Sequence, residues 1–331
     1  MIDLHCHLDG SLPFSAIPEL ARLSGLPYDS RKNRLTLQEN CRSLDDFLAC
    51  FSYPVSLLQS FESIAYASEA LFVELAHEGI LYAEVRYAPQ LSLERGLSQK
   101  EVTVAMIEGY QRAHQKTGIL GSLILCLMRG EKTEALNQET IAVAHQFLNQ
   151  GVSGVDLAGP ERAFPTRLYA KEFALAKRLG IPITIHAGED AGADSVKEAV
   201  ALGATRIGHG IHAIEDQELL KELANKGVVL EICPTSECDT HCIPSLKALP
   251  LREFLSAGIA VTLGHDDRTI SGTTLQKEYQ KLERTFALTP LEATEIIHQG
   301  VSSAFLDGND KAKLSALVDE ALRKDNPFVR L

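Results

Sequence analysis

Residues 1–10, M-I-D-L-H-C-H-L-D-G, decide how the rest of the chain is interpreted. Their alternation of apolar and polar residues is typical of a β-strand, in which side chains two positions apart leave the same face. His5 and His7 therefore point in one direction, and Asp9 follows them on that face. Two neutral imidazoles at this spacing can bind one divalent transition metal. Two histidines on a strand exposed to water would give the same pattern. The pair indicates a metal site only if later strands supply the remaining ligands.

Length and composition restrict the class of protein. At 331 residues, 45% hydrophobic and 23% charged, the chain has the balance of a globular protein with a sizeable core. A net charge of −12 argues against nucleic acid or an anionic membrane as the main partner. No basic segment with an apolar run opens the chain, and no run of about 18 apolar residues occurs in it, so we expect a cytoplasmic protein that acts on a small molecule.

The cysteines indicate reduced thiols. There are 7, an odd number scattered along the chain, which is not the pattern of a disulfide framework. Cys238, His241 and Cys242 form a C-x-x-H-C cluster, with Cys233 shortly before it. A second zinc site is one interpretation of this cluster. Since no paired C-x-x-C accompanies it, we favour incidental loop thiols.

Helical and strand-like segments alternate along the chain. After the opening strand and a helix at 13–23, we predict strands at 81–88, 120–128, 152–157, 181–186, 206–208, 228–233 and 259–263, and helices at 63–78, 98–117, 133–149, 168–179, 195–202, 216–226, 250–257, 275–286, 290–306 and 312–323. This order indicates an α/β protein with parallel strands closed into a single (β/α)8 TIM barrel. An open doubly wound sheet is the alternative, but no Gly-x-Gly-x-x-Gly fingerprint follows the first strand. No linker divides the chain, so we expect one domain over 1–331, with extra C-terminal helices.

An insertion of helices is expected directly after the first strand. Ser43 precedes apolar residues at helical spacings, among them Phe47 and Phe51. An insertion at this point lies over the C-terminal mouth of a barrel. Phe47 and Phe51 are therefore candidates for a lid over an aromatic substrate, while ordinary helix packing explains most of the other apolar residues.

Polar residues gather where the predicted strands end, which is where barrel enzymes do their chemistry. His186 and Glu189 follow one strand, His209 lies between two glycines after the next, and Asp266 and Asp267 follow the last. Three histidines and a carboxylate converging on one mouth suit Zn²⁺. Each of these residues alone could be structural, but their coincidence at strand ends is the strongest signal in the sequence.

Four motifs resemble those of the adenosine deaminase family of the amidohydrolase superfamily. They are H-x-H-L-D-G at 5–10, H-A-G-E at 186–189, G-H-G at 208–210 and D-D at 266–267. The resemblance extends over nearly the whole chain and includes L-D-D-F-L at 44–48 and S-G-T-T at 271–274. It implies a zinc-dependent enzyme that converts adenosine, and 2′-deoxyadenosine, to the inosine nucleoside and ammonia in purine salvage.

The resemblance also implies a role for each matching residue. One zinc per chain would be held by His5, His7, His186 and Asp266. Glu189 would protonate purine N1, and His209 and Asp266 would act on the attacking water. Substrate would be contacted by Asp267, accepting a hydrogen bond at purine N7, by the Gly159 N–H at N3, and by Asp9 at the ribose 5′-hydroxyl.

The chemistry of deamination needs the same parts. Zinc lowers the pKa of water from 15.7 toward about 7, so that a nucleophile is available at neutral pH. Attack on the ring breaks its conjugation, and a proton delivered to a ring nitrogen offsets that loss. A neutral carboxylic acid beside the ring can supply this proton.

Several residues depart from the family's pattern. Gly264 and His265 stand where Asn-Thr is common, Arg268 stands where Pro is common, and Glu237 replaces a common Asn. His265 and Arg268 either point into the barrel wall or to solvent, or they alter specificity, with Arg268 meeting an anionic group of the substrate. Adenine, AMP, and N6-substituted or 5′-modified adenosines therefore stay open as alternatives.

Two other classes of protein compete with a deaminase. An amidohydrolase acting on a lactone, amide or phosphoester often bridges two metals with a modified lysine on strand 4, but the predicted strand 152–157 has no lysine. A purine-binding protein without catalysis is the other rival. Glu189 weighs against it, because binding alone does not need an acid at that position.

Overall fold

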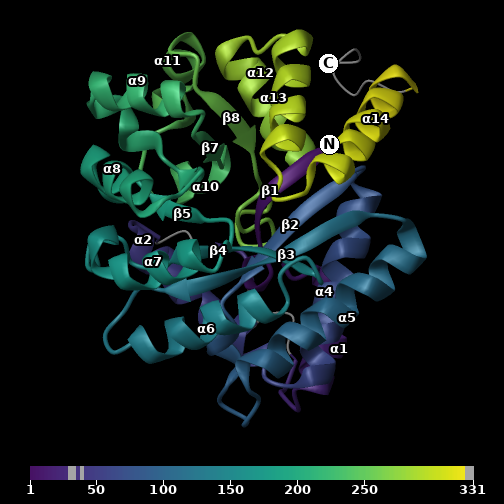
Figure 1. The fold of residues 1–331 in the computed structure, drawn as a ribbon. Coiled ribbons are helices and arrows are strands. Elements are labelled where there is room, and N and C mark those ends of the chain that lie inside the picture. The colour runs from purple at the N-terminus through teal and green to yellow at the C-terminus, as the bar shows by residue number, and fades with distance from the viewer. Residues whose placement is uncertain (29–34, 38–40, 325–331) are drawn as a thin grey trace.

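Parallel strands form the centre of the molecule, and helices surround them (Figure 1). The computed structural model describes residues 1–28, 35–37 and 41–324. The strands are β1 (Ile2–His7), β2 (Tyr82–Tyr87), β3 (Leu120–Met128), β4 (Val152–Ala158), β5 (Thr184–Ala187), β6 (Arg206–His209), β7 (Val229–Ile232) and β8 (Ala260–Leu263). They pair in sequence order as two parallel sheets, β1 to β4 and β5 to β8.

Two seams join these sheets into a closed barrel. At the first seam Val155 of β4 bridges to Ile183 ahead of β5, and the Val155 N–H donates to the Pro182 carbonyl at 3.0 Å. At the second seam Asp266 follows β8 and pairs with β1. Its N–H donates to the His5 carbonyl at 2.8 Å, and its carbonyl accepts from the His7 N–H at 2.9 Å. The predicted (β/α)8 barrel is confirmed, and its last seam runs through residues predicted to bind metal.

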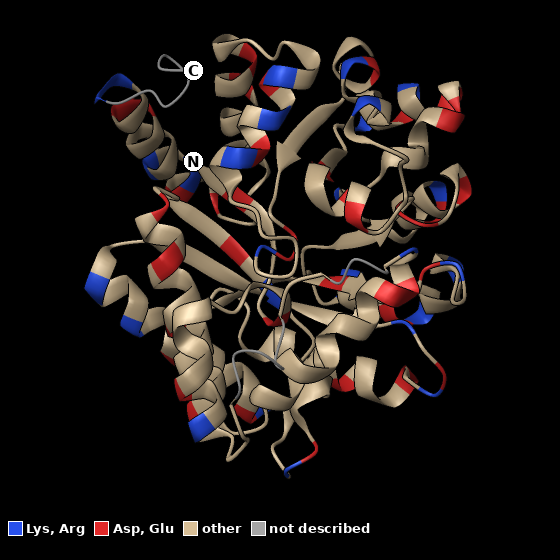
Figure 2. Cartoon of the chain, turned by 180° about the vertical axis from the view of Figure 1, so that it is seen from behind, with Lys and Arg blue, Asp and Glu red and all other residues tan. Residues whose placement is uncertain are grey.

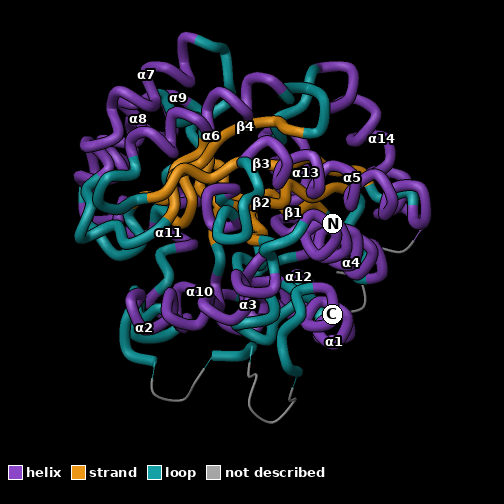
Figure 3. Tube along the Cα trace, turned by 90° about the horizontal axis from the view of Figure 1, so that it is seen from below, coloured by secondary structure: helices purple, strands orange, loops and turns teal. Residues whose placement is uncertain are grey.

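The helices occupy nearly the positions expected. They are α1 (Ile17–Leu23), α2 (Leu44–Leu48), α3 (Ser52–Leu57), α4 (Phe61–His77), α5 (Gln99–Thr117), α6 (Glu134–Gln146), α7 (Ala170–Arg178), α8 (Ala193–Leu202), α9 (Gln217–Lys226), α10 (Pro234–Asp239), α11 (Leu251–Ser256), α12 (Leu275–Phe286), α13 (Pro290–Ser303) and α14 (Gly308–Lys324). Figure 3 shows them around the strands, with α2, α3 and α10 together on one side. No described helix is long and apolar enough to cross a membrane.

A few boundaries differ from the prediction for local reasons. The helix expected over 13–23 starts as one 3-10 turn at Phe14–Ala16, and its α-helical part is only α1. The helix expected over 133–149 ends at Gln146, and Asn149 takes a positive φ of 61° that helices exclude. Helix α10 was not predicted, because its six residues are mostly polar and give no apolar stripe at helical spacing.

The interior of the barrel contains buried charges, which Figure 2 shows as red and blue segments on the central strands. The Glu231 carboxylate of β7 is fully buried and accepts four hydrogen bonds. The donors are His5 Nδ1 at 2.8 Å, Arg86 Nη2 at 2.8 Å, Arg206 Nε at 2.6 Å and Thr184 Oγ1 at 3.0 Å. Burial raises the pKa of Glu231, but Arg86 and Arg206 outweigh it and hold that pKa well below its ordinary value.

The two arginines extend this network across the barrel. Arg86 Nη1 donates to Asp156 of β4 at 2.9 Å, and Arg206 Nη2 donates to Glu84 of β2 at 2.5 Å. The Arg206 guanidinium also stacks 3.7 Å from the ring centroid of Phe305. The strands are therefore tied to one another by side-chain charges as well as by backbone hydrogen bonds.

Arg206→Leu should lower the free energy of unfolding by about 3–5 kcal/mol, because it leaves Glu84 and Glu231 buried with less opposite charge. Urea unfolding followed by circular dichroism measures the change. The control is Arg178→Leu, at the exposed end of α7, which should stay within about 0.5 kcal/mol of the unmodified protein. Equal stability of the two variants would contradict a stabilising role for the network.

Candidate functional site

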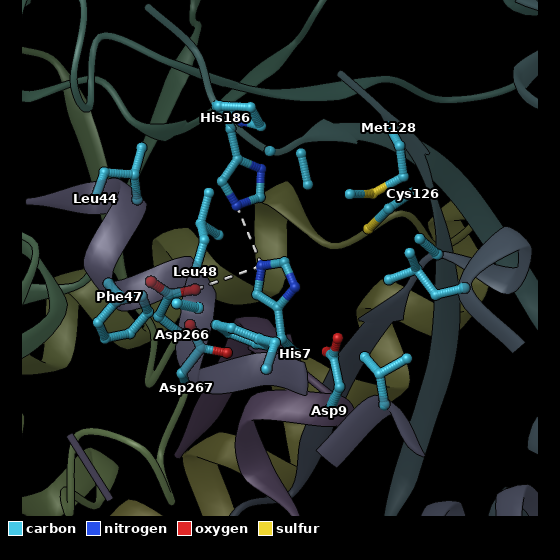
Figure 4. Close-up of a pocket in the computed structure, with 18 of the residues that line it drawn as sticks. His7, Asp9, Leu44, Phe47, Leu48, Cys126, Met128, His186, Asp266 and Asp267 are labelled. Carbon is cyan, nitrogen blue, oxygen red and sulfur yellow. Dashed lines mark hydrogen bonds and ion pairs between the residues drawn. The ribbon is translucent and has the colours of Figure 1, made fainter. Parts of the chain in front are cut away.

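A cavity of about 380 Å³ lies at the carboxyl ends of the strands, covered by α2 and α3. The barrel contributes His7, Asp9, Gly159, His186, Glu189, His209, Asp266 and Asp267 to its lining. The insertion contributes apolar side chains, among them Leu44, Phe47, Leu48, Phe51 and Val55. Figure 4 shows members of both sets around the same space, with His7, His186 and Asp266 from the barrel and Leu44, Phe47 and Leu48 from the insertion. Every residue predicted for the site lines this cavity except His5, whose Nε2 lies 3.2 Å from the Nε2 of His186 in the lining.

Four ligand atoms meet at the floor of the cavity. His186 Nε2 lies 3.2 Å from His5 Nε2 and 3.1 Å from His7 Nε2. Asp266 Oδ1 lies 3.3 Å and 3.4 Å from the same two nitrogens. A tetrahedral zinc with ligand bonds of about 2.0–2.1 Å holds its ligands about 3.3 Å apart. The spacing of these atoms therefore fits a cation at their centre.

The protonation of the rings leads to the same conclusion. His5 Nδ1 donates to Glu231, and His186 Nδ1 donates to Asp156 at 2.8 Å, so each Nε2 keeps its lone pair. Burial lowers the pKa of His186 to about 4, which keeps that ring neutral. Two lone pairs facing each other at 3.2 Å repel, and a cation between them removes the repulsion. Carboxylates that orient metal-binding imidazoles in this way are a regular feature of metal sites.

Asp266 is held so that one of its oxygens faces the histidines. Its backbone has a φ of 58°, a left-handed conformation that is costly for a residue with a side chain. Ser236 Oγ donates to Asp266 Oδ2 at 2.6 Å, which leaves Oδ1 for a ligand. Gly264 is required two residues earlier, because a Cβ there would lie 2.6 Å from the His5 Cβ.

Glu189 and His209 face each other on another wall. His209 Nε2 lies 3.6 Å from Glu189 Oε2 and 3.9 Å from Asp266 Oδ2. Burial raises the pKa of Glu189 to about 8; His209 opposes this shift, and the charge of Asp266 adds to it. Glu189 is therefore a carboxylic acid that can donate a proton at neutral pH. On the other side of the ring, Glu237 Oε1 lies 3.5 Å from His209 Nδ1.

Two more carboxyl groups offer unused hydrogen-bonding atoms. Asp9 Oδ1 and Asp267 Oδ1 are buried and have no hydrogen-bond partner within the described part of the chain. Burial, reinforced by the charge of Asp266, raises the pKa of Asp267 well above its ordinary range. An unsatisfied buried oxygen is costly, so both positions are suited to a ligand. Gly10 is needed beside them, because a Cβ there would collide with Asp267 Oδ1 at 1.6 Å.

The two unusual residues around the aspartate pair face away from the cavity. His265 Nδ1 donates to Asp3. Arg268 Nη1 donates to Glu74 of α4 at 2.8 Å, and its Nη2 donates to Glu78. Of the two interpretations, the structure supports the one in which these side chains lie in the barrel wall. Arg268 is therefore not placed to meet an anionic substrate.

The C-x-x-H-C cluster has ordinary partners. His241 Nε2 donates to the Cys41 carbonyl at 2.9 Å, and Thr240 Oγ1 donates to Cys242 Sγ at 3.1 Å. Within the described residues this cluster does not bring its side chains together in a group that could hold a metal. The interpretation as incidental loop thiols fits these contacts.

Several residues of the site were missed in the sequence. Asp156, Glu231 and Ser236 support the ligands, and Glu161 supports the loop that carries Glu189. A signal existed for two of them, since Asp156 and Glu231 are single carboxylates within otherwise apolar strands. Glu161 lies in a loop, where polar residues are expected, and Ser236 is one of several polar residues of the short helix α10, so nothing distinguished them.

Comparison with known proteins gives a consistent result. The family model described as adenosine deaminase matches residues 1–321. An adenosine deaminase of Haemophilus ducreyi is 39% identical over 97% of this chain and 96% of its own length. One of Enterococcus faecalis is 36% identical over 97% of this chain and 96% of its own length.

Solved structures of related enzymes share the fold. The N6-methyl-AMP deaminase of Arabidopsis thaliana aligns with a TM-score of 0.86 at 25% identity, over 98% of this chain and 97% of its own. The adenine deaminase of Arthrobacter aurescens aligns with a TM-score of 0.85 at 24% identity, over 97% of this chain and 98% of its own. The second likeness supports the barrel alone.

The free energy of unfolding of Glu189→Gln should exceed that of the unmodified protein by an amount that grows as the pH rises from 5 to about 7.5. The folded state keeps the Glu189 proton up to a pKa of about 8, whereas the unfolded chain releases it near the ordinary value of 4.5. The unmodified protein therefore loses up to about 1.4 kcal/mol of stability per pH unit from this residue. Glutamine does not titrate and avoids the loss.

Urea unfolding of both proteins between pH 5 and 7.5 measures this difference. The two proteins should be close in stability at pH 5 and diverge steadily above it. A constant difference across the range would mean that Glu189 is already ionised in the folded protein.

Proposed function

The chain belongs to the adenosine deaminase family and is a hydrolytic deaminase, and on that premise we propose that it converts adenosine and 2′-deoxyadenosine to inosine and 2′-deoxyinosine with release of ammonia. The observation that carries the proposal is that Glu189, whose pKa burial raises to about 8, lines the same cavity as the four closely spaced nitrogen and oxygen atoms on its floor. Such a pairing suits water attack on a ring carbon combined with protonation of the adjacent ring nitrogen.

We infer that one Zn²⁺ per chain is held by His5, His7, His186 and Asp266. Their nitrogen and oxygen atoms form the donor set that zinc accepts, at separations that fit its bond lengths. When bound, the ion lowers the pKa of water and so supplies a nucleophile at neutral pH.

The protein's own groups move the protons. Glu189, protonated below about pH 8, donates its proton to purine N1. Asp266 Oδ2, 3.9 Å from His209 Nε2, is placed to receive a proton from the attacking water. Burial lowers the pKa of His209, but Glu189, Glu237 and Asp266 outweigh it and raise that pKa well above its ordinary value, so we assign this ring to orienting the water as a hydrogen-bond donor. General acid and base assistance of this kind contributes a rate factor of about 10²–10⁴.

The hydrogen bond at purine N7 runs opposite to the direction expected from the sequence. A neutral purine N7 carries a lone pair and accepts a hydrogen bond. A hydrogen bond to N7 therefore needs a protonated Asp267, and burial together with the charge of Asp266 raises the pKa of this side chain, so we assign it as the donor to N7. Gly159, with a φ of 108° at the end of β4, has no side chain to separate its backbone from the base.

The charge of the cavity favours an uncharged nucleoside over a nucleotide. Among the described residues that line it, none is Lys or Arg, while Asp9, Glu189, Asp266 and Asp267 are acidic. A phosphate group is normally bound by cationic side chains or clustered N–H donors. AMP and N6-methyl-AMP therefore fit this cavity less well than adenosine.

Asp9 favours a nucleoside over free adenine. Its Oδ1 is buried without a partner in the described chain, and burial raises the pKa of the carboxyl to about 7. A ribose hydroxyl can satisfy this oxygen, whereas a free base would leave it unpaired. The resemblance to the family places the 5′-hydroxyl at this residue.

Two broader expectations accompany the assignment. We propose that residues 1–331 act as one domain, because one continuous buried cluster runs from Ile2 to Val318. The substrate is a small molecule. A cytoplasmic role in purine salvage stays a prediction.

A panel of substrates tests the activity. Ammonia release by the zinc-loaded protein should be fastest with adenosine and 2′-deoxyadenosine, and at least about tenfold slower with adenine, AMP and N6-methyl-AMP, the difference expected from one unpaired or repelled polar group. Glu189→Gln should lose a factor of about 10²–10⁴ in turnover on adenosine. Faster turnover of AMP would contradict the argument from charge, and faster turnover of adenine would contradict the role of Asp9.

Removing one ligand tests the metal site separately. His186→Ala should lower both zinc content and turnover, because it takes away a nitrogen that faces two of the other ligands. The matched control is His212→Ala, whose ring pairs with Glu215 outside the cavity lining and should retain zinc. Mass spectrometry of the metal after dialysis gives the stoichiometry. Unchanged zinc in His186→Ala would remove His186 from the ligand set.

A further inference from the structure

The Glu161 carboxylate lies beneath the loop that carries the acid Glu189. Glu161 follows β4 by three residues and is 1% exposed. Its Oε1 accepts from the Gly188 N–H at 2.7 Å. Its Oε2 accepts from the N–H groups of Glu189 at 3.1 Å, Asp190 at 2.9 Å and Ala191 at 3.1 Å.

We propose that Glu161 is a positioning residue that sets the orientation of Glu189 toward the substrate, an inference that rests on the proposed function. Four consecutive N–H groups converge on one carboxylate, so the backbone of 188–191 must curve around it. Gly188 allows this curvature with a φ of 69°. Because the backbone donors of the loop point inward to Glu161, the Glu189 side chain is directed into the cavity.

A chain of polar groups connects this anchor to the metal-binding wall. The Ser195 hydroxyl donates to Glu161 and lies 2.9 Å from Thr166 Oγ1. Arg129 Nη2 donates to Thr166 Oγ1 at 2.9 Å and to the His186 carbonyl at 2.6 Å. The acid and one of the proposed ligands are therefore held by the same buried network.

Glu161 also links two walls of the cavity. It lies two residues after Gly159, which lines the cavity where the base is proposed to bind. A shift of the 159–161 segment would move the Glu189 loop with it. The negative charge of Glu161 additionally opposes ionisation of Glu189, in the same direction as burial.

The variant Glu161→Gln separates positioning from simple filling of space. Glutamine has nearly the same shape, but its NH₂ group replaces one acceptor oxygen, so either Gly188 or the three following amides lose their acceptor. Ser195→Ala is the milder companion, because it removes a donor from Glu161 and leaves all four backbone hydrogen bonds. Glu172→Gln, at a buried carboxyl of α7 outside the cavity lining, is the control.

Hydrogen exchange of the amides of 188–191 in the zinc-loaded protein is the first readout. In Glu161→Gln their exchange should accelerate at least about tenfold, as expected for the loss of a hydrogen bond to a charged group. Peptides from α5 should be unchanged, and Glu172→Gln should match the unmodified protein. Since this readout does not need turnover, it stands even if adenosine is not the substrate.

Kinetics on adenosine are the second readout. The kcat of Glu161→Gln should fall at least about tenfold, with KM changed less than about threefold and zinc content unchanged, because the change acts on the acid rather than on binding. If Glu161→Gln does not fold, Glu161→Asp, which keeps the charge but shortens the side chain, should show both effects at smaller size. Unchanged exchange of 188–191, or equal falls of kcat in Glu161→Gln and Glu172→Gln, would overturn the proposal.

Discussion

The site depends on the Glu231 carboxylate at the centre of the barrel. This buried group takes hydrogen bonds from two arginines and from His5 at the same time. The arginines keep it ionised, and the ionised carboxylate fixes the tautomer of His5 with its free Nε2 at the mouth. A carboxylate buried without these partners would be very costly. One charge thus contributes both to the stability of the barrel and to the orientation of His5.

The mouth of the barrel combines groups that are individually unfavourable. His209 and Asp266 have positive φ values, and Asp9 and Asp267 carry buried oxygens that have no hydrogen-bond partner among the described residues. Glu189 is held neutral by burial at the cost of stability at neutral pH. Strain and unsatisfied polarity of this kind are concentrated at functional sites, where a ligand or a cation satisfies them. The buried ion pairs below the mouth provide the rigidity that keeps these groups in place.

The barrel and the floor of the site were predictable from the sequence, because both follow from simple periodicities. The alternation of apolar and polar residues placed His5 and His7 on one face of the first strand. The glycines on either side of His209 marked the end of β6. The supporting residues were not predictable in the same way. The contact of Glu231 with His5 joins residues 226 positions apart, so only the closure of the barrel brings them together. The hydrogen bonds of Glu161 go to backbone groups, which have no sequence signature. The orientation of Arg268 away from the cavity depends on Glu74 of α4 and on Glu78 directly after this helix, and both lie far away in the chain.

X-ray absorption at the zinc edge of the zinc-loaded protein distinguishes the barrel mouth from the cysteines as the metal site. Binding by His5, His7, His186 and Asp266 gives a first shell of imidazole nitrogens and carboxylate oxygen at about 2.0–2.2 Å, without sulfur. A sulfur shell at about 2.3 Å would place the metal at cysteines, such as Cys238 and Cys242, and would contradict the assignment of the barrel mouth as the metal site.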